Sequence, residues 1–369
     1  MTLCHIVPSI PPEFNGLGDY CYQLWKHWPE PASWEILTTR IPDGAREHWP
    51  GAKIESFERS AEGLSAKLSV IGARTVVLHY VGYAYAKRGA PVWLPRVLSD
   101  WKRRTGGRLV VMFHELFATG PPWSSAFWLL PAQMGVAQML ASVADRWITS
   151  CPSYMRSLER YLRAEMSKGT MIPIGSTIDP VAEPAWGRAW PTEHGGKLKI
   201  VNFGMPVTRL RTLRVHRNLL KSLVDHGLVE NVLLTGKSDS PGAVLDETNV
   251  TLQAAGCANL TTRAFDLSTP ELSRLLLDQH LGLIHNPYAT LTKSTVYAAY
   301  CTHGLLSVVP PERGTQPGPY VINDDSKPEA CVLEIESSHW KPSREERASL
   351  LFETISEKFA AVCEAVRPT

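Results

Sequence analysis

The sequence predicts an α/β protein built from two Rossmann-like, doubly wound domains. Short apolar strands alternate with helical patterns along the whole chain, which is typical of parallel sheets covered by helices. Each half opens with a strand, a glycine-containing turn and a helix. A stretch rich in proline, glycine and tryptophan separates the halves. We therefore expect an N-terminal domain over residues 1–180, a linker over 181–196, a C-terminal domain over 197–342 and a tail helix over 343–366.

Composition and length narrow the class of protein. The 369 residues are too many for one compact set of layers, and 44% hydrophobic and 20% charged residues are typical of a globular enzyme. The net charge of +2 indicates no nucleic-acid partner. The seven cysteines include no CxxC pair, which favours free thiols in a reducing cytoplasm. We expect neither a signal peptide nor a membrane span. Peripheral membrane contact, at the inner face of the membrane, stays open, and oligomeric state is not readable.

In the N-terminal half, apolar runs predict strands over 3–7, 34–38, 75–80, 108–113, 146–150 and 171–174. Gly16 and Gly18 form a turn after the first strand, and helical spacing begins at Asp19. A dinucleotide fingerprint would need glycine at Cys21, so this turn alone is weak support for a ligand. Further helices are expected over 95–104, 131–144 and 154–162.

His114 and Glu115 follow the buried strand 108–113. The carboxyl end of a buried parallel strand is where α/β enzymes place catalytic groups. The alternative is a hydrogen-bonded core histidine followed by an ordinary helix-start charge. The next loop, rich in glycine, proline and tryptophan, predicts a shaped lip.

In the C-terminal half, the strand 198–203 ends at Gly204 and precedes a loop with several arginines. The strand 232–235 ends in Gly236, Lys237 and Ser238. A phosphate-binding P-loop would need glycine at Asn231, so we reject that motif. The arginines that we expect to lie close together in the loop are Arg209, Arg211, Arg214 and Arg217.

Residues 281–309 predict a strand, a helix that opens near Ser294 and stops at Gly304, and a second strand. Lys293, Ser294 and Thr295 place a cation, hydroxyl groups and unpaired amides at a helix N-terminus, which favours phosphate. The alternative is an ordinary N-cap beside a solvated lysine.

Together the two sets of strand ends predict a cleft between the domains. The C-terminal wall, with arginines, lysine and helix amides, suits a diphosphate. The N-terminal wall suits an acceptor that carries a hydroxyl group. These features point to group transfer from a nucleoside diphosphate donor.

Several motifs resemble one enzyme family along nearly the whole chain. They are PPEFNGLGDY, HYVGYAYAKRGAPVWL, MFHELF with GPPW after it, PIGST, NFG and KSTVYAAYCTHG. The chain resembles the bacterial family-4-like glycosyltransferases (glycosyltransferase group 1) with the GT-B fold. The resemblance implies that the C-terminal half binds a UDP- or GDP-sugar and the N-terminal half a glycan or lipid-linked acceptor. It also implies that the tail helix crosses back to the first domain.

The resemblance assigns roles by position. Gly16 and Gly18 would approach the transferred sugar and phosphate, and His114 would contact the sugar. The expected donor-binding residues are completed by Gly204, Arg209 or Arg211, Lys237, Asn286, Lys293, Ser294 and Thr295. The expected acceptor-binding residues are Tyr80, Tyr83 and Trp123.

The chain departs from the family at one point. The usual pair of glutamates around the helix that opens near Ser294 is missing, because residues 285–304 contain no acid. Either Asn286 and Lys293 replace these contacts, or donor binding is changed or lost. The second case would make the chain a sugar- or nucleotide-binding protein, and an epimerase on the same scaffold is a third reading.

We expect no obligatory metal and no cofactor besides the donor, because the chain lacks a DxD motif and this fold neutralises the leaving group with protein cations and dipoles. The resemblance favours retention of configuration, in which the leaving phosphate can take the acceptor's proton. If the reaction inverts, the candidates for the general base are Asp19, His114 and Glu115.

Overall fold

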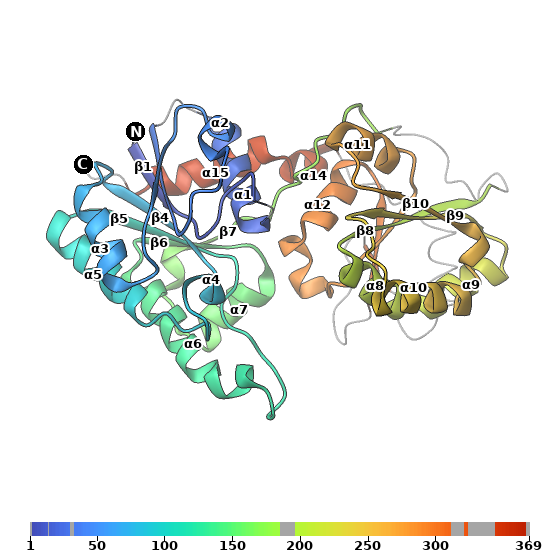
Figure 1. Cartoon of the computed structure of the whole chain (residues 1–369), viewed down its shortest axis with the longest axis horizontal. Coiled ribbons are helices and arrows are strands. Elements are labelled where there is room, and N and C mark those ends of the chain that lie inside the picture. The colour runs from blue at the N-terminus through green and yellow to red at the C-terminus, as the bar shows by residue number, and fades with distance from the viewer. Residues whose placement is uncertain are drawn as a thin grey trace. The chain divides into compact units, whose positions relative to one another are not determined.

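The computed structural model describes residues 2–13, 15–29, 33–184, 196–310, 321–323 and 344–366. The chain forms two compact units, unit 1 (Met1–Ile174 with Phe352–Thr369) and unit 2 (Gly175–Leu351). Each unit has one parallel sheet with helices on both faces, so the predicted fold class is confirmed (Figure 1). The first segment of unit 1 ends before the expected position 180. Residues 185–195 of the expected linker lie outside the described ranges.

The sheet of unit 1 has the strand order β3-β2-β1-β4-β5-β6-β7. All its pairs are parallel, and β1 lies between β2 and β4. The chain therefore reverses its direction of travel across the sheet between β1 and β4, which makes the carboxyl ends of these strands a switch point. The strands are β1 (Thr2–Ile6), β2 (Ser33–Thr38), β3 (Lys53–Ser56), β4 (Thr75–Tyr80), β5 (Arg108–Phe113), β6 (Arg146–Thr149) and β7 (Gly169–Met171).

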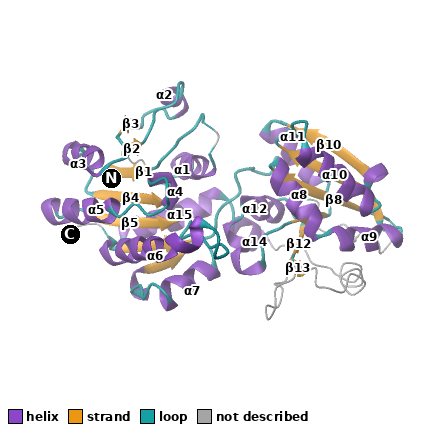
Figure 2. Cartoon of the chain, turned by 60° about the horizontal axis from the view of Figure 1, so that its bottom comes forward, coloured by secondary structure: helices purple, strands orange, loops and turns teal. Residues whose placement is uncertain are grey.

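Two apolar cores cover the two faces of this sheet, since alternate residues of a strand point to opposite faces. On β4, Val76 and Leu78 join one core, while Val77 joins the other. The helices are α1 (Gly16–Lys26), α2 (Ala45–His48), α3 (Ala61–Val70), α4 (Gly82–Tyr85), α5 (Trp93–Thr105), α6 (Ser125–Val143), α7 (Pro152–Arg160), a 3-10 turn (Met166–Lys168) and α15 (Phe352–Glu364). Figure 2 shows helices on both sides of the strands.

The C-terminal segment returns to unit 1, as the resemblance implies. Phe352, Ile355 and Phe359 of α15 enter the core that α1 also lines. The expected single tail helix is wrong, however. Two helices occupy this region, α14 (Arg344–Ser349) in unit 2 and α15 in unit 1. Leu350 packs on unit 2, so the helix is interrupted where the chain passes from one unit to the other. Ser343, the first residue of the expected tail helix, lies outside the described residues.

The sheet of unit 2 repeats the same pattern in the order β10-β9-β8-β11-β12-β13, again with parallel pairs. Its switch point lies between β8 and β11. The strands are β8 (Leu198–Gly204), β9 (Val229–Gly236), β10 (Thr261–Phe265), β11 (Leu281–Leu283), β12 (Leu306–Val309) and β13 (Val321–Asn323).

One helix of unit 2 occupies a stretch that is expected to be a loop. The expected arginine loop is the helix α8, which begins at Pro206 because proline fits the first helical position. The helices are α8 (Pro206–Val215), α9 (Arg217–Asp225), α10 (Ala243–Ala254), α11 (Thr269–Leu277), α12 (Thr295–Thr302), α14, and the 3-10 turns η3 (Ala258–Leu260) and η4 (Tyr288–Lys293).

Candidate functional site

The carboxyl ends of β8 and β9 approach each other closely in unit 2. Gly204 ends β8 with a φ of +143°, and Gly236 ends β9 with a φ of +112°. A Cβ atom on Gly236 would lie 2.4 Å from the carbonyl oxygen of Gly204. Only glycine allows this backbone conformation at such a short approach. The two glycines therefore leave backbone, rather than side chains, at the edge of the switch point.

The helix α12 begins beside this edge, directly after the turn that follows β11. The helix begins where the sequence predicts, and Ser294 is its N-cap, which is the alternative reading of this residue; its hydroxyl oxygen accepts a hydrogen bond from the Tyr297 N–H at 3.2 Å. Tyr300 fixes the helix on the sheet, because its hydroxyl accepts from the Phe203 N–H at 3.0 Å. A Cβ atom on Gly282 would lie 2.2 Å from the Tyr300 ring, so the ring packs directly on β11. Lys293, Ser294 and Thr295 are half-buried at this helix start.

Arg209 is buried, which corrects its expected role as a diphosphate ligand. Its side chain is only 1% exposed and forms an ion pair with Asp239. The guanidinium also donates to the carbonyl oxygens of Gly204, Thr235 and Lys237, the last at 2.7 Å. Because the guanidinium N–H groups point at these internal partners, Arg209 fastens the ends of β8 and β9 together and is a structural residue.

Arg211 is the exposed arginine of α8 that remains a donor-binding candidate. Burial lowers the pKa of His285, and the positive charge of Arg211 lowers it further. His285 lies just after β11, and Arg211 lies on the helix that follows β8, the neighbouring strand. His216, also on this side, hydrogen-bonds through Nε2 to the Ile284 carbonyl oxygen at 2.8 Å. Arg211 is therefore the exposed member of the predicted pair of arginines, on the helix that follows β8.

The other predicted donor residues lie on the same edge. Asn286 is half-buried directly after β11 and His285. Lys237 follows Gly236 and forms an ion pair with Asp266 at 2.8 Å, with 60% of its side chain exposed. Four of the predicted donor-binding features therefore lie at or after the ends of β8 and β11, the two strands of the switch point: Gly204, Arg211, Asn286 and the start of α12. Lys237 follows β9, which is one strand further along the sheet.

In unit 1, α1 starts earlier than expected, so the glycines belong to its first turn and not to a loop. Asn15 caps the helix, and its Oδ1 accepts from the Leu17 N–H at 2.9 Å. A Cβ atom on Gly18 would lie 2.6 Å from the Ser9 carbonyl oxygen, whereas one on Gly16 would meet nothing within 4 Å. Gly18 is therefore required by packing. Gly16 is exposed at the helix N-terminus, where a ligand can approach the backbone.

Asp19 is expected to make stability depend on pH. Burial raises the pKa of this carboxyl from 3.8 to about 6. Between about pH 4 and pH 6 the folded state holds a proton that the unfolded chain has released, so the free energy of unfolding falls as pH rises, by up to about 2 kcal/mol. Urea unfolding of the wild type and Asp19→Asn at several pH values tests this. The difference between them should change across this window, whereas Asp100→Asn, at an exposed acid, should run parallel to the wild type.

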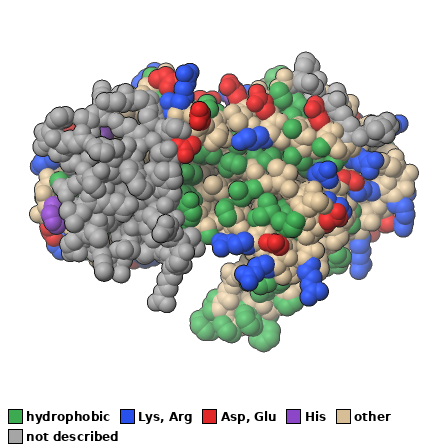
Figure 3. All heavy atoms as spheres, turned by 180° about the vertical axis from the view of Figure 1, so that it is seen from behind, with side chains coloured by type: hydrophobic (Ala, Val, Ile, Leu, Met, Phe, Trp, Pro, Cys, Tyr) green, Lys and Arg blue, Asp and Glu red, His purple; other side chains and the backbone are tan. Residues whose placement is uncertain are grey.

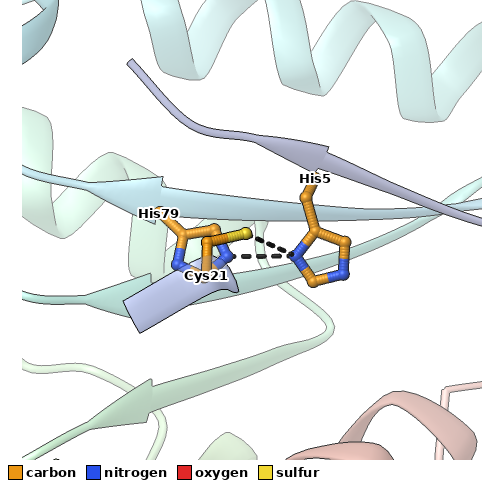
Figure 4. Close-up of side chains that lie close together, drawn as sticks. All are labelled: His5, Cys21 and His79. Carbon is orange, nitrogen blue, oxygen red and sulfur yellow. Dashed lines mark hydrogen bonds between the residues drawn. The ribbon is translucent and has the colours of Figure 1, made fainter. Parts of the chain in front are cut away.

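His114 lies at the carboxyl end of β5, as predicted, and is the last member of a buried histidine chain. His5 Nδ1 lies 3.0 Å from His79 Nε2, and His79 Nδ1 lies 3.1 Å from His114 Nε2. Figure 4 shows the first of these pairs, with Cys21 beside it. Val77 is the register partner of His5, and Met112 that of His79. Each histidine therefore lies two residues further along its strand than the one before, and the chain runs diagonally toward the carboxyl edge.

The hydrogen bonds along this chain of imidazoles all run in one direction, from donor to acceptor. Burial lowers the pKa of His5 and lowers that of His79 to about 3, so both rings are neutral. A neutral imidazole donates once, and His5 Nε2 is buried without a hydrogen-bond partner among the described residues. A proton on that atom would be a buried, unpaired N–H. We therefore assign the ring protons to Nδ1 of each histidine, so that His5 donates to His79 and His79 to His114.

His5, Cys21 and His79 are also the described residues whose atoms could hold a metal ion. One ring nitrogen from each histidine and the Cys21 sulfur lie within 4.8 Å of one another. All three residues are fully buried, and burial raises the pKa of the Cys21 thiol. The contact of Cys21 Sγ with His5 Nδ1 is 3.9 Å. Sequence reasoning missed His5 and His79, since nothing in the sequence pairs their strands.

The predicted acceptor residues separate into two groups. Tyr80 is fully buried in the core and cannot contact an acceptor. Tyr83 is 41% exposed and accepts a hydrogen bond from Gln133 at 3.2 Å, and Trp123 is 86% exposed. Glu115 is exposed directly after His114. The acceptor role therefore remains a prediction for Tyr83 and Trp123, and is wrong for Tyr80.

Comparison with known proteins shows the fold. The chain matches no protein-family model and no curated protein sequence. Among solved structures it is similar to sucrose-phosphate synthase from Thermosynechococcus elongatus (TM-score 0.67, 12% identity, 99% of this chain and 98% of that one). It is also similar to HepE from Anabaena in complex with UDP and glucose (0.64, 11%, 99% of each chain) and to a UDP-N-acetylglucosamine 2-epimerase (0.50, 11%, 97% and 94%). The chain thus has a GT-B-like fold.

Proposed function

We propose that this protein is a glycosyltransferase that moves a sugar from a UDP- or GDP-sugar to a hydroxyl group of a glycan or lipid-linked acceptor. Unit 2 binds the donor and unit 1 the acceptor. The reaction retains the anomeric configuration and needs no obligatory metal. The enzyme works in the cytoplasm. The burial of the six described cysteines as free thiols is in keeping with that compartment.

One observation carries the proposal. The cation Lys293, the capped start of α12 and the exposed Arg211 all belong to elements that follow the strands of the unit 2 switch point. Ligands of open α/β sheets bind at such points, and a helix N-terminus with nearby cations favours a diphosphate. The similarity to a structure that contains UDP and glucose supports the same class of ligand.

A second candidate function is nucleotide or sugar binding without transfer. Residues 285–304 contain no acid, so the sugar and ribose contacts that the resemblance leads us to expect must be made by other groups or be absent. Release of nucleoside diphosphate from any donor in the presence of an acceptor would exclude this candidate. An epimerase would instead interconvert nucleotide sugars without an acceptor, so analysis of the sugar product separates it from a transferase.

Lys293→Ala is expected to weaken UDP or GDP binding about tenfold, because a charge-assisted contact to a phosphate contributes roughly 1.5–3 kcal/mol. Titration calorimetry of the full chain with each nucleotide measures this. Lys221→Ala is the matched control, since Lys221 is an exposed lysine of α9 that pairs with Asp225 at 2.7 Å. Equal affinity of the wild type and Lys293→Ala would contradict the placement of the diphosphate at α12.

A further inference from the structure

Unit 1 carries a group of exposed aromatic side chains at one projecting end, which we call the aromatic tip (residues 119–132). Trp123 is 86% exposed, Trp128 73% and Phe127 40%. The rings of Phe127 and Trp128 pack edge to face, with centroids 5.4 Å apart. Figure 3 shows hydrophobic side chains gathered at the end of this protrusion. Exposed apolar surface gathered in one place marks a docking surface more often than scattered single residues do.

The aromatic tip is held in place at its base. Gln133 is buried, and its Oε1 accepts a hydrogen bond from the Ala118 N–H at 2.8 Å. Its Nε2 donates to the Tyr83 hydroxyl at 3.2 Å and to the Arg88 carbonyl oxygen at 3.1 Å. These bonds pin both ends of the tip to the body of unit 1. The exposed rings are therefore presented on a fixed base, which lowers the entropy lost on binding.

The helix that carries the tip lies on unit 1 and does not leave it. By length and composition α6 is apolar enough to cross a membrane, contrary to the expectation from sequence, and only 28% of its apolar window is buried. Its second half, however, supplies Val136, Ala137 and Leu140 to the core of unit 1. A helix anchored in this way can insert only its first turns. This arrangement fits a helix that lies in a membrane interface rather than one that spans it.

The charged residues around the tip indicate which kind of partner it binds. Residues 116–144 contain no charged side chain, and residues 81–99, which meet α6 at Gln133, contain no acid. Lys87 and Arg88 are exposed in that second segment. Tryptophan is enriched where protein meets the head groups of lipids, and each nearby cation adds about 1 kcal/mol of attraction to an anionic leaflet. A second protein copy would have to offer a deep apolar socket for a convex tip.

We propose that the aromatic tip docks unit 1 on the surface of a bilayer that contains anionic lipid. Trp123, Phe127 and Trp128 enter the interfacial layer, and Lys87 and Arg88 face the head groups. The inference goes beyond the proposed function and uses no donor or acceptor chemistry. It also gives Trp123 a different role from the predicted contact with an acceptor.

The experiment is flotation of the full chain with vesicles of phosphatidylcholine alone or with phosphatidylglycerol added. The wild type is expected to float with the mixed vesicles, and the double variant Trp123→Ser/Trp128→Ser to lose about tenfold or more in partitioning. Lys87→Gln/Arg88→Gln is expected to weaken binding to the mixed vesicles only. Tyr161→Ser is the matched control, because Tyr161 is an aromatic residue of unit 1 that is 63% exposed outside the tip.

Three outcomes would overturn the inference. In the first, the wild type floats with neither kind of vesicle. In the second, the wild type and the double tryptophan variant float equally well. In the third, the wild type sediments as a dimer and the double variant as a monomer, because the tip would then be an interface between two copies of the chain. Melting temperatures of all variants confirm that they fold. Both tryptophans are largely exposed, so their replacement should leave the melting temperature unchanged.

Discussion

Arg209→Ala is expected to destabilise unit 2 by about 3–5 kcal/mol, the usual effect of removing one partner of a buried ion pair. The substitution would leave Asp239, whose side chain is 7% exposed, without its cation. It would also remove the donors that hold the carbonyl oxygens of Gly204, Thr235 and Lys237. Calorimetric unfolding of the full chain measures the loss, which should appear in the transition of unit 2.

Arg211→Ala is the matched control, because Arg211 lies on the same helix and is exposed. We expect its melting temperature to match that of the wild type and its affinity for UDP to fall. Arg209→Lys keeps the charge but not the forked donors, and should recover only part of the stability. A stable Arg209→Ala protein with weakened UDP binding would contradict the structural role of Arg209 and restore it as a diphosphate ligand.

His79→Leu is expected to cost about 2–4 kcal/mol, because it removes the hydrogen bonds that the His79 ring makes with two buried ring nitrogens. These are His5 Nδ1 and His114 Nε2, both within 3.1 Å of the His79 ring. The His79 ring also stacks on Phe359 of α15. Leucine would occupy most of the same volume but could not stack on the Phe359 ring. Urea unfolding at neutral pH measures the change. If the proposed transfer reaction is correct, turnover should fall as well, since His114 loses the donor that fixes its ring.

The pH dependence of this difference provides a second readout. The folded state holds His79 neutral down to about pH 3, while an unfolded histidine takes up a proton near pH 6.5. The free energy of unfolding of the wild type therefore falls as pH drops below about 6.5. His79→Leu lacks this contribution, because it has no imidazole at position 79. The gap between the two proteins should narrow in acid. His226→Leu, at an exposed histidine of unit 2, should show neither effect, and a constant gap would contradict the buried neutral chain.

Local sequence patterns located the strands that are buried on both faces. The predicted bounds of strands 75–80 and 108–113 match the structure residue for residue. Short, continuous apolar runs with β-branched residues are typical of strands that are buried on both faces. The start of the helix near Ser294 is also predicted correctly, since the cap there is a local contact in which the Ser294 hydroxyl accepts from an amide only three residues away. Such features depend on neighbours along the chain, and the sequence displays those neighbours directly.

The arginines of α8 show where local patterns are insufficient. Their density suggested a polar loop, yet Pro206 starts a helix and Leu210 and Leu213 are buried beneath it. Arg209 is buried because carbonyl oxygens from the ends of two different strands, and an aspartate thirty positions away, converge on its guanidinium. No spacing within the helix distinguishes Arg209 from Arg211, so only the packed structure separates the structural arginine from the exposed one.

Local patterns along the chain predict the two α/β halves, most of the buried strands, His114 at a strand end and the helix start at 293–295. Which strands lie side by side can be seen only in the folded chain. Because β1 lies beside β4 and β4 beside β5, His5, His79 and His114 form one chain, although each lies on its own distant segment. Strand order depends on hydrogen bonds between residues far apart in the chain, and hydrophobic periodicity does not encode which strands pair.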